Sequence, residues 1–451
     1  MMRWRGSLSI ALVASLAGLL FGFDTAVISG VIGPLRQHFM LSPAMLGAAV
    51  SSALWGTLLG ALLAGRPGDR FGSRDTLKLV GVFYLVCALG CALCWSLASF
   101  MVFRFIGGLA IGGSSVLAPV YIAELAPAAR RGARVGLFQF NVVLGILVAY
   151  LSNFLLAQLL PTPGVWRVQL LVAGFPAALF LGLLFTIPQS PRWLATGKRY
   201  AEAREILRQL GSPDPAQEVA RYADDPGAGG SMALSWRAHR RPIVLAITLA
   251  LFNQLSGINA ILYYLNDIFG AAGYSQLSAS LQAVLIGGAN LLSTAAALLV
   301  IDRLGRRPLL MAGAVGTSVA LGGVALIMHF GVDRSALLPL LILFIVSFAF
   351  SQGAVIWVYL SEIFPAAVRA RGQGLGSATH WIANAVIAML FPLIAATTRA
   401  LPFAIFALCM LLQLVVVWAF FPETRGVALE SMAMRLRGSP RPAPAASASR
   451  P

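Results

Sequence analysis

The chain has 451 residues, of which 59% are hydrophobic and 11% are charged, and its mean hydropathy is +0.83. Because a soluble domain carries about a quarter charged residues and about half apolar ones, this composition excludes an ordinary soluble enzyme and indicates a protein embedded in a lipid bilayer. The net charge of +17 does not indicate a nucleic-acid partner, since the basic residues gather in alternate loops, as the positive-inside rule of membrane proteins describes.

Apolar runs long enough to cross a bilayer core of about 30 Å as helices recur along the whole chain. Their continuous apolarity favours helices over barrel strands, which would alternate with a period of two. The first run is too long for a removable signal peptide and carries an internal Asp24. We therefore predict an all-α membrane protein with spans near 8–30, 45–65, 76–96, 100–124, 133–159, 166–187, 241–269, 277–301, 308–330, 337–361, 374–397 and 401–421.

A polar stretch divides these spans into two sets of six. We predict an N-terminal half at 1–188, a linker with short amphipathic helices at 189–240, a C-terminal half at 241–423, and a disordered tail at 424–451 that is rich in Pro, Ala and Ser. The basic loops, which include this linker, predict that the linker and both termini are cytoplasmic.

The two halves repeat each other in sequence. Asp69-Arg70-Phe71-Gly72 recurs as Asp302-Arg303-Leu304-Gly305, and Tyr121-Ile-Ala-Glu-Leu-Ala-Pro127 recurs as Tyr359-Leu-Ser-Glu-Ile-Phe-Pro365, at offsets of about 235 residues. Repeated six-span halves with a substrate site between them are typical of secondary transporters that rock about a cavity at the membrane midplane.

Acidic and basic residues of the repeated motifs lie at the cytoplasmic ends of adjacent spans. Pairs between them would form a latch that holds the inner ends of the helices together while the cavity faces outward. The alternative is that these charges serve only solvation and topology. The latch residues predicted are Asp69, Arg70, Arg74, Glu124, Arg131, Asp302, Arg303, Arg306, Glu362 and Arg369, with Glu124 or Glu362 pairing with Arg131 or Arg369.

Asp24 lies in the middle of the first span. A carboxylate inside a membrane costs on the order of 2.5–3.5 kcal/mol on insertion scales, so it must face a cavity or a partner. The expected partner is Arg104 in the fourth span. Since burial and a nearby cation shift the affinity of a carboxylate for protons in opposite directions, the pair is a candidate for proton loading and release. A fixed structural ion pair is the alternative.

The seventh span contains the amides that carbohydrate recognition needs. Asn253, Gln254 and Asn259 can donate to and accept from hydroxyl groups, and Gly257 among them allows a break in the helix. Hydrogen bonding between helices is the alternative for any one buried amide. Aromatic faces cover the C–H surface of a sugar. Further amides and aromatics that lie within spans are Gln139, Asn290, Tyr263, Tyr264, Trp357 and Trp381.

The remaining motifs do not indicate catalysis. Cys91 and Cys94 have a CxxC spacing, but within an apolar run and without a histidine or third thiol they are expected to pack; Cys87 and Cys409 also lie in apolar runs. Glycines of the fourth span predict close helix packing and not a nucleotide loop. We expect no enzyme, no cofactor and no metal.

The chain resembles the sugar porters of the major facilitator superfamily over essentially its whole length. The resemblance implies the major facilitator fold, a bacterial inner membrane location and import of a monosaccharide, with a monomer as the functional unit. The matching motifs are Gly22–Gly30, Asp69–Gly72, Tyr121–Pro127, Ser190–Trp193, Gln254–Asn259, Ser361–Pro365 and Pro422–Gly426.

The resemblance also implies roles for individual residues. Asp24 matches the position that couples protons, with Arg104 as its partner. The positions implied in sugar contact are Gln139, Asn253, Gln254, Asn259, Asn290, Trp357, His380 and Trp381, and those implied in the cavity or its gates are Phe21, Ile146, Tyr263, Tyr264 and Gly353.

Several positions depart from the family pattern. Ile146 stands where glucose-transporting relatives also have Ile, which favours a hexose over a pentose. His380 replaces an amide beside Trp381 and adds a titratable group to the site. The usual Pro is absent after Gly353, and Gln189 replaces a Glu, which weakens the latch of the first half. We predict proton-coupled import of a monosaccharide; a facilitator, a polyol or inositol symporter and a transporter-like sugar receptor are the alternatives.

Overall fold

Among the residues that it describes, the computed structural model contains twelve helices that are long and apolar enough to cross a membrane, which confirms the predicted spans. The structure describes residues 7–127, 130–224, 234–331, 334–365, 368–425 and 432. Within these ranges the side chains of residues 224, 298–303 and 370 are not described, and most of the predicted tail at 424–451 lies outside the described residues.

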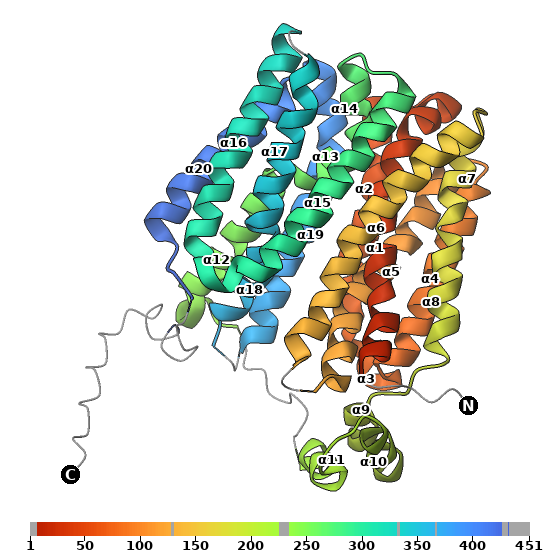
Figure 1. The fold of residues 1–451 in the computed structure, drawn as a ribbon, viewed down its shortest axis with the longest axis vertical. Coiled ribbons are helices and arrows are strands. Elements are labelled where there is room, and N and C mark those ends of the chain that lie inside the picture. The colour runs from red at the N-terminus through yellow and green to blue at the C-terminus, as the bar shows by residue number, and fades with distance from the viewer. Residues whose placement is uncertain are drawn as a thin grey trace.

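The first six spans form one bundle (Figure 1). Serine side chains accept hydrogen bonds at two of the helix starts, Ser42 from the Met45 N–H and Ser96 from the Ser99 N–H, and so fix where these helices begin. The helices are α1 (Ser7–Phe39), α2 (Pro43–Leu63), the short α3 (Gly65–Phe71), α4 (Ser73–Ala92), α5 (Leu97–Leu125), α6 (Arg131–Leu159), α7 (Val165–Val172) and α8 (Gly174–Leu184), the last two forming the sixth span.

The second bundle contains two broken spans. The seventh breaks at Gly257, as predicted, where a φ of +80° favours glycine, and the tenth breaks at Ser351. The helices are α12 (Trp236–Leu255), α13 (Ile258–Tyr263), α14 (Leu265–Ala271), α15 (Gln276–Leu304), α16 (Arg306–Phe330), η2 (Arg334–Ala336), α17 (Leu337–Phe350), α18 (Gln352–Glu362), α19 (Arg369–Thr397) and α20 (Leu401–Phe420).

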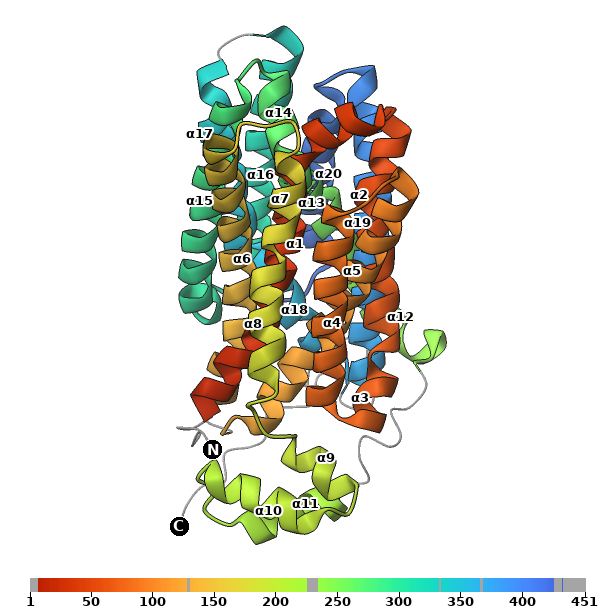
Figure 2. The ribbon, with the colours of Figure 1, turned by 90° about the vertical axis from the view of Figure 1, so that its right-hand side faces the viewer.

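Three short helices of the linker lie beyond one end of the spans (Figures 1 and 2). They are α9 (Pro191–Thr196), α10 (Tyr200–Gln209) and α11 (Pro215–Asp224), and they share a small core that includes Leu194, Ala203 and Leu207. We call this end of the molecule the linker end and the other the opposite end.

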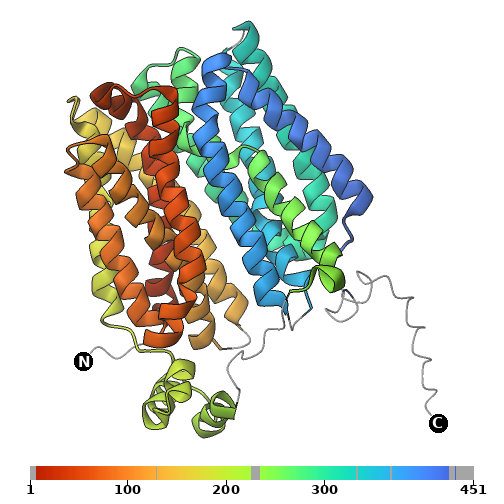
Figure 3. The same cartoon turned by 180° about the vertical axis from the view of Figure 1, so that it is seen from behind.

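The two bundles lie side by side (Figure 3) and touch through α2 with α19, α6 with α15, and α1 with α13 and α14. Three polar contacts between the bundles all involve α13 or α14. The Tyr150 hydroxyl donates to the Leu262 carbonyl at 2.8 Å, the Asn266 N–H donates to Ser29 Oγ at 3.1 Å, and Arg36 pairs with Asp267. The described contacts therefore join the bundles toward the opposite end.

Glycines let α2 and α5 approach closely, as the sequence predicted for the fourth span. A Cβ atom at Gly108 would lie 1.9 Å from the Ala53 carbonyl oxygen, and one at Gly112 would lie 2.1 Å from that of Thr57. Any larger side chain would force the helices apart, because a backbone oxygen cannot move aside as a flexible side chain can.

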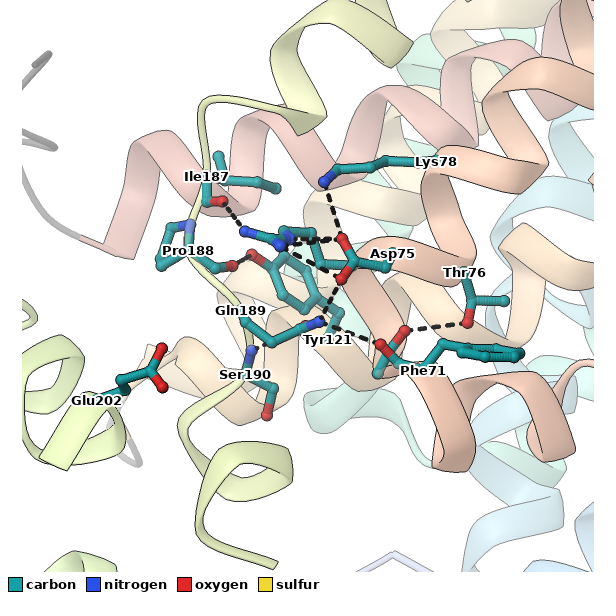
Figure 4. Close-up of polar contacts among 12 residues, drawn as sticks. Phe71, Asp75, Thr76, Lys78, Tyr121, Ile187, Pro188, Gln189, Ser190 and Glu202 are labelled. Carbon is teal, nitrogen blue, oxygen red and sulfur yellow. Dashed lines mark hydrogen bonds and ion pairs between the residues drawn. The ribbon is translucent and has the colours of Figure 1, made fainter. Parts of the chain in front are cut away.

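The linker end of the first bundle holds a polar network around Asp75 (Figure 4). Arg74 and Lys78 pair with this carboxylate at 3.0 and 2.8 Å, and the Gln189 amide donates to it at 3.1 Å. Gly72, with a φ of +84°, begins α4 and lies against the Gln189 side chain. The Tyr121 hydroxyl donates to the Pro188 carbonyl, so the network ties α4 and α5 to the start of the linker.

The second bundle repeats this arrangement with a carboxylate in place of the amide. Gly305, with a φ of +89°, begins α16 and lies against Glu423, whose two oxygens accept the N–H groups of Arg306 and Arg307 at 3.0 Å each. Burial alone would raise the pKa of Glu423, but hydrogen bonds from backbone N–H groups, including these two, hold it below its ordinary value. Glu423 therefore caps α16 as an anion.

We expect Gly108→Val to destabilise the protein, because its side chain would overlap the Ala53 carbonyl; overpacking costs roughly 1–3 kcal/mol or more. Thermal unfolding of the purified protein in detergent measures this as a lower midpoint. Gly182→Ala on α8 is the matched control, since a Cβ there meets no atom within 4 Å. Equal midpoints for the two variants would contradict the packing described.

We expect Glu423→Gln to lower the stability at pH 7 by roughly 0.3–1 kcal/mol, since it removes an anion from a helix N-terminus. Because the folded pKa of Glu423 is depressed, its contribution is present above the ordinary value of 4.5 and is lost as the pH falls through the folded pKa. Unfolding midpoints should therefore converge in acid. Glu205→Gln, which changes only exposed contacts with Arg208 and Gln209, is the control, because exposed ion pairs contribute little to stability. A pH-independent difference for Glu423→Gln would contradict this prediction.

Candidate functional site

The predicted pair of Asp24 and Arg104 is present and buried. Arg104 Nη1 on α5 lies 2.6 Å from Asp24 Oδ1 on α1, and the two side chains are 4% and 11% exposed. Asp24 Oδ2 and Arg104 Nε have no hydrogen-bond partner among the described residues. Within the described contacts, the carboxylate is therefore bound through one of its two oxygens.

The amides of the seventh span form one connected cluster at the break of that span. The Asn259 amide donates to Gln254 Oε1 at 2.9 Å, and the Gln254 amide donates to Asn253 Oδ1 at 3.0 Å. The left-handed turn at Gly257 places the end of α12 beside the start of α13 and so brings the three side chains together. Backbone irregularity at membrane depth is tolerated where it is buried in protein or lines a cavity.

His380 on α19 joins this cluster. The Gln254 amide nitrogen lies 3.2 Å from Nδ1 and 3.1 Å from Nε2 of the imidazole, and the ring lies between Trp357 and Trp381, with centroids 5.3 and 5.1 Å away. Trp381 also faces Phe21 on α1 across 5.8 Å. Trp357 on α18 is 40% exposed whereas His380 is 8% exposed, so the indole is the more accessible of these two rings.

The predicted gate residues on α13 and just after it are buried and hydrogen-bonded. The Asn384 amide of α19 donates to the Tyr263 hydroxyl at 3.2 Å, and the Tyr264 hydroxyl donates to the Ala388 carbonyl at 3.0 Å. Asn384 was missed by the sequence analysis, although a buried amide within a span is the same signal that selected the others. Ile146 on α6 is also buried.

The remaining predicted substrate residues are not joined to the cluster by the described contacts. Gln139 on α6 is half-buried, and Asn290 on α15 is buried. Gly353 follows the break in the tenth span, which the structure places at Ser351. A cavity of about 580 Å³ lies between the bundles at the opposite end; among the residues predicted for the site, only Tyr264 lines it.

The latch residues form pairs that differ from those predicted. Glu362 binds Arg306 at 2.9 Å, whereas Arg369 donates to the Phe364 carbonyl at 3.4 Å and Arg131 donates to the Ala123 carbonyl at 3.0 Å. The predicted pairing of Glu124 or Glu362 with Arg131 or Arg369 is therefore wrong. Glu124 on α5 is half-buried, Asp69 and Arg70 are exposed, Arg74 binds Asp75, and the side chains of Asp302 and Arg303 lie outside the described residues.

Solved structures of a sugar symporter share this fold. The xylose transporter of Escherichia coli in an inward-open conformation matches with a TM-score of 0.84 at 34% identity, over 94% of this chain and 99% of that chain. The same proton:xylose symporter bound to 6-bromo-6-deoxy-D-glucose matches with a TM-score of 0.77 at 34% identity, over 96% and 100%. The fold is therefore that of a major facilitator transporter.

Sequence comparison agrees over nearly the full length. The chain is 34% identical to the D-xylose-proton symporter of Escherichia coli over 94% of both chains. It is 35% identical to the arabinose-proton symporter of Bacillus subtilis, over 94% of this chain and 93% of that protein, and 33% identical to a glucose transport protein of Synechocystis, over 94% and 96%. These relatives and the apolar spans indicate a multi-pass inner membrane transporter and not an enzyme.

The pattern of the family described as "Sugar (and other) transporter" matches residues 10–436. With this match and the full-length relatives, the chain belongs to the sugar porter family of the major facilitator superfamily.

Proposed function

We propose that this protein imports a monosaccharide by proton symport, through alternating access of a site between its two bundles. The buried pair of Asp24 and Arg104 is the observation that carries this proposal. The free second oxygen of Asp24 takes up the proton, and the guanidinium holds the carboxylate in place in either protonation state. Two named relatives, the xylose and arabinose symporters, are proton-coupled.

The amide cluster is the proposed sugar site. Asn253, Gln254 and Asn259 offer donors and acceptors at the break in the seventh span, and the accessible indole of Trp357 offers an apolar face for the sugar ring. Gln139 and Asn290 reach the sugar from α6 and α15 in this proposal. Sugar hydroxyls replace the hydrogen bonds that these amides now make with one another, so binding leaves no buried polar group unpaired.

The described arrangement corresponds in this proposal to a cavity open toward the linker end, with that end in the cytoplasm. The contacts between bundles at α13 and α14 support it, as do the exposure of Trp357 and the better match to the inward-open relative. The basic linker and loops support a cytoplasmic linker end and termini. The networks around Asp75 and Glu423 join elements within one bundle each, so both bundles can rock as rigid bodies.

The substrate is proposed as a monosaccharide without assignment of one sugar. Ile146 favours a hexose in the sequence analysis, but the relatives are named for xylose, arabinose and glucose alike. The comparisons therefore give no support to a preference for hexoses over pentoses. A monomer is the proposed functional unit, since each bundle contributes to one site within the same chain.

Replacement of Asp24 by Asn is expected to abolish accumulation of sugar while leaving exchange, because the amide keeps an oxygen toward Arg104 but cannot carry a proton. Proteoliposomes with an alkaline interior measure accumulation, and counterflow of labelled sugar measures exchange. Glu205→Gln, which changes an exposed carboxylate on the linker helix α10, is the control and is expected to retain accumulation. Wild-type protein that only equilibrates sugar at any pH gradient would identify a facilitator and contradict the proposal.

Removal of the Gln254 amide is expected to weaken sugar binding, because Gln254 is the shared member of the cluster. Gln254→Ala should raise the KM for exchange by about tenfold or more, as expected when a site loses a hydrogen-bonding partner. Competition with unlabelled hexoses, pentoses and polyols identifies the preferred substrate in both proteins. An unchanged KM and an unchanged order of competitors would place the sugar elsewhere, and absence of any transport would favour a receptor.

A further inference from the structure

Two thiols on α4 face the proposed proton-coupling pair. The sulfur atoms of Cys87 and Cys91 are 3.9 Å apart, and the two residues are 5% and 1% exposed. Both line a cavity of about 10 Å³ whose wall also includes Asp24 and Arg104. The thiol pair and the ion pair therefore share one small space inside the first bundle.

The packing of α5 fixes the thiol of Cys87 in this position. A Cβ atom on Gly107 would lie 2.4 Å from Cys87 Sγ, so the sulfur occupies the space left by this glycine, one turn along α5 from Arg104. The Cys91 thiol lies 3.9 Å from the Phe100 carbonyl oxygen. The pair is spaced four residues apart within α4, which places both side chains on one face of the helix. Cys94 lies beyond Ala92, where α4 ends, so the CxxC spacing of Cys91 and Cys94 does not place those two thiols on one helix face.

The separation of the two sulfurs suits a bridging atom better than a direct bond. A disulfide needs sulfur atoms about 2.05 Å apart, whereas an atom bonded to both sulfurs holds them farther apart. Trivalent arsenic is a soft centre that binds paired thiols. An organic arsenic oxide reacts with two thiols so that both S–H bonds break, two As–S bonds form, and the oxide oxygen leaves as water with the two thiol protons. No atom changes its oxidation state.

We propose that Cys87 and Cys91 form a binding site for trivalent arsenicals, and that an adduct there blocks proton-driven uptake. The second half of this proposal rests on the proposed role of Asp24. The shared cavity has room for about one water molecule. An arsenic atom with an organic group cannot fit without displacing its walls, which include Asp24, Arg104 and Leu170.

Phenylarsine oxide tests the site on the purified full-length protein. Intact mass spectrometry of a Cys94→Ser/Cys409→Ser variant should show one phenylarsenic group per chain. Cys87→Ser or Cys91→Ala in this background should remove the adduct, because one thiol cannot close the bridge. Sugar exchange measured without the arsenical shows that each variant is folded. No adduct in the first variant, or an adduct that persists after loss of either thiol, would overturn the site.

Uptake in proteoliposomes tests the consequence. Phenylarsine oxide should lower proton-driven uptake by about tenfold, as expected when a packed core is forced to rearrange, and a small dithiol should restore it. The variants lacking Cys87 or Cys91 should resist, and those lacking Cys94 or Cys409 should remain sensitive. An adduct with unchanged uptake would overturn the proposed block. Failure of the wild-type protein to accumulate sugar would instead refute the proposed function, and the mass measurement would still decide the site.

Discussion

A carboxylate buried within a membrane is the constraint around which this structure is arranged. Asp24 needs a cation, and Arg104 supplies it from a helix eighty positions along the chain at 2.6 Å. Two buried charges stabilise a protein only when their geometry and hydrogen bonds are nearly complete, yet one carboxylate oxygen of Asp24 has no hydrogen-bond partner in the described part of the chain. This incompleteness is costly for a purely structural pair and useful for a group that must gain and lose a proton.

The proposed sugar site depends on a second departure from regular structure. The break at Gly257 turns the chain so that amides on α12 and α13 meet. His380 of α19 contacts Gln254, and the indoles of Trp357 and Trp381 lie beside its ring. The ion pair lies in the first bundle and the amides in the second, and Phe21 against Trp381 is one contact between them. In the proposed cycle, protonation of Asp24 in the first bundle affects sugar binding in the second because the two bundles move against each other.

Much of the fold and of the candidate site was predictable from the sequence, because a bilayer restricts which structures a chain can form within it. The length of the apolar runs predicted the spans. The cost of burying a charge in the membrane predicted that Asp24 pairs with Arg104, and the glycine among the amides predicted the break at Gly257. Partner choice at the linker end was not predictable, because it depends on the turns at Gly72 and Gly305, which bring Gln189 and Glu423 to the helix starts. The contact of His380 with Gln254 also required the packed helices, since residues so far apart in the sequence carry no local signal for each other. The four-residue spacing of Cys87 and Cys91 is a local signal for that pair, but its position beside Asp24 and Arg104 depends on how the helices pack.

The most direct test of the central claim is whether sugar carries a proton with it. Wild-type protein in liposomes without an imposed gradient should take up protons when a transported sugar is added outside. A pH-sensitive dye sealed in the vesicles should then report acidification in proportion to the sugar that enters, with one proton for each sugar because Asp24 is the proposed single carrier. Sugar entry with no acidification would show that the pair of Asp24 and Arg104 is a structural ion pair and that the protein is a facilitator.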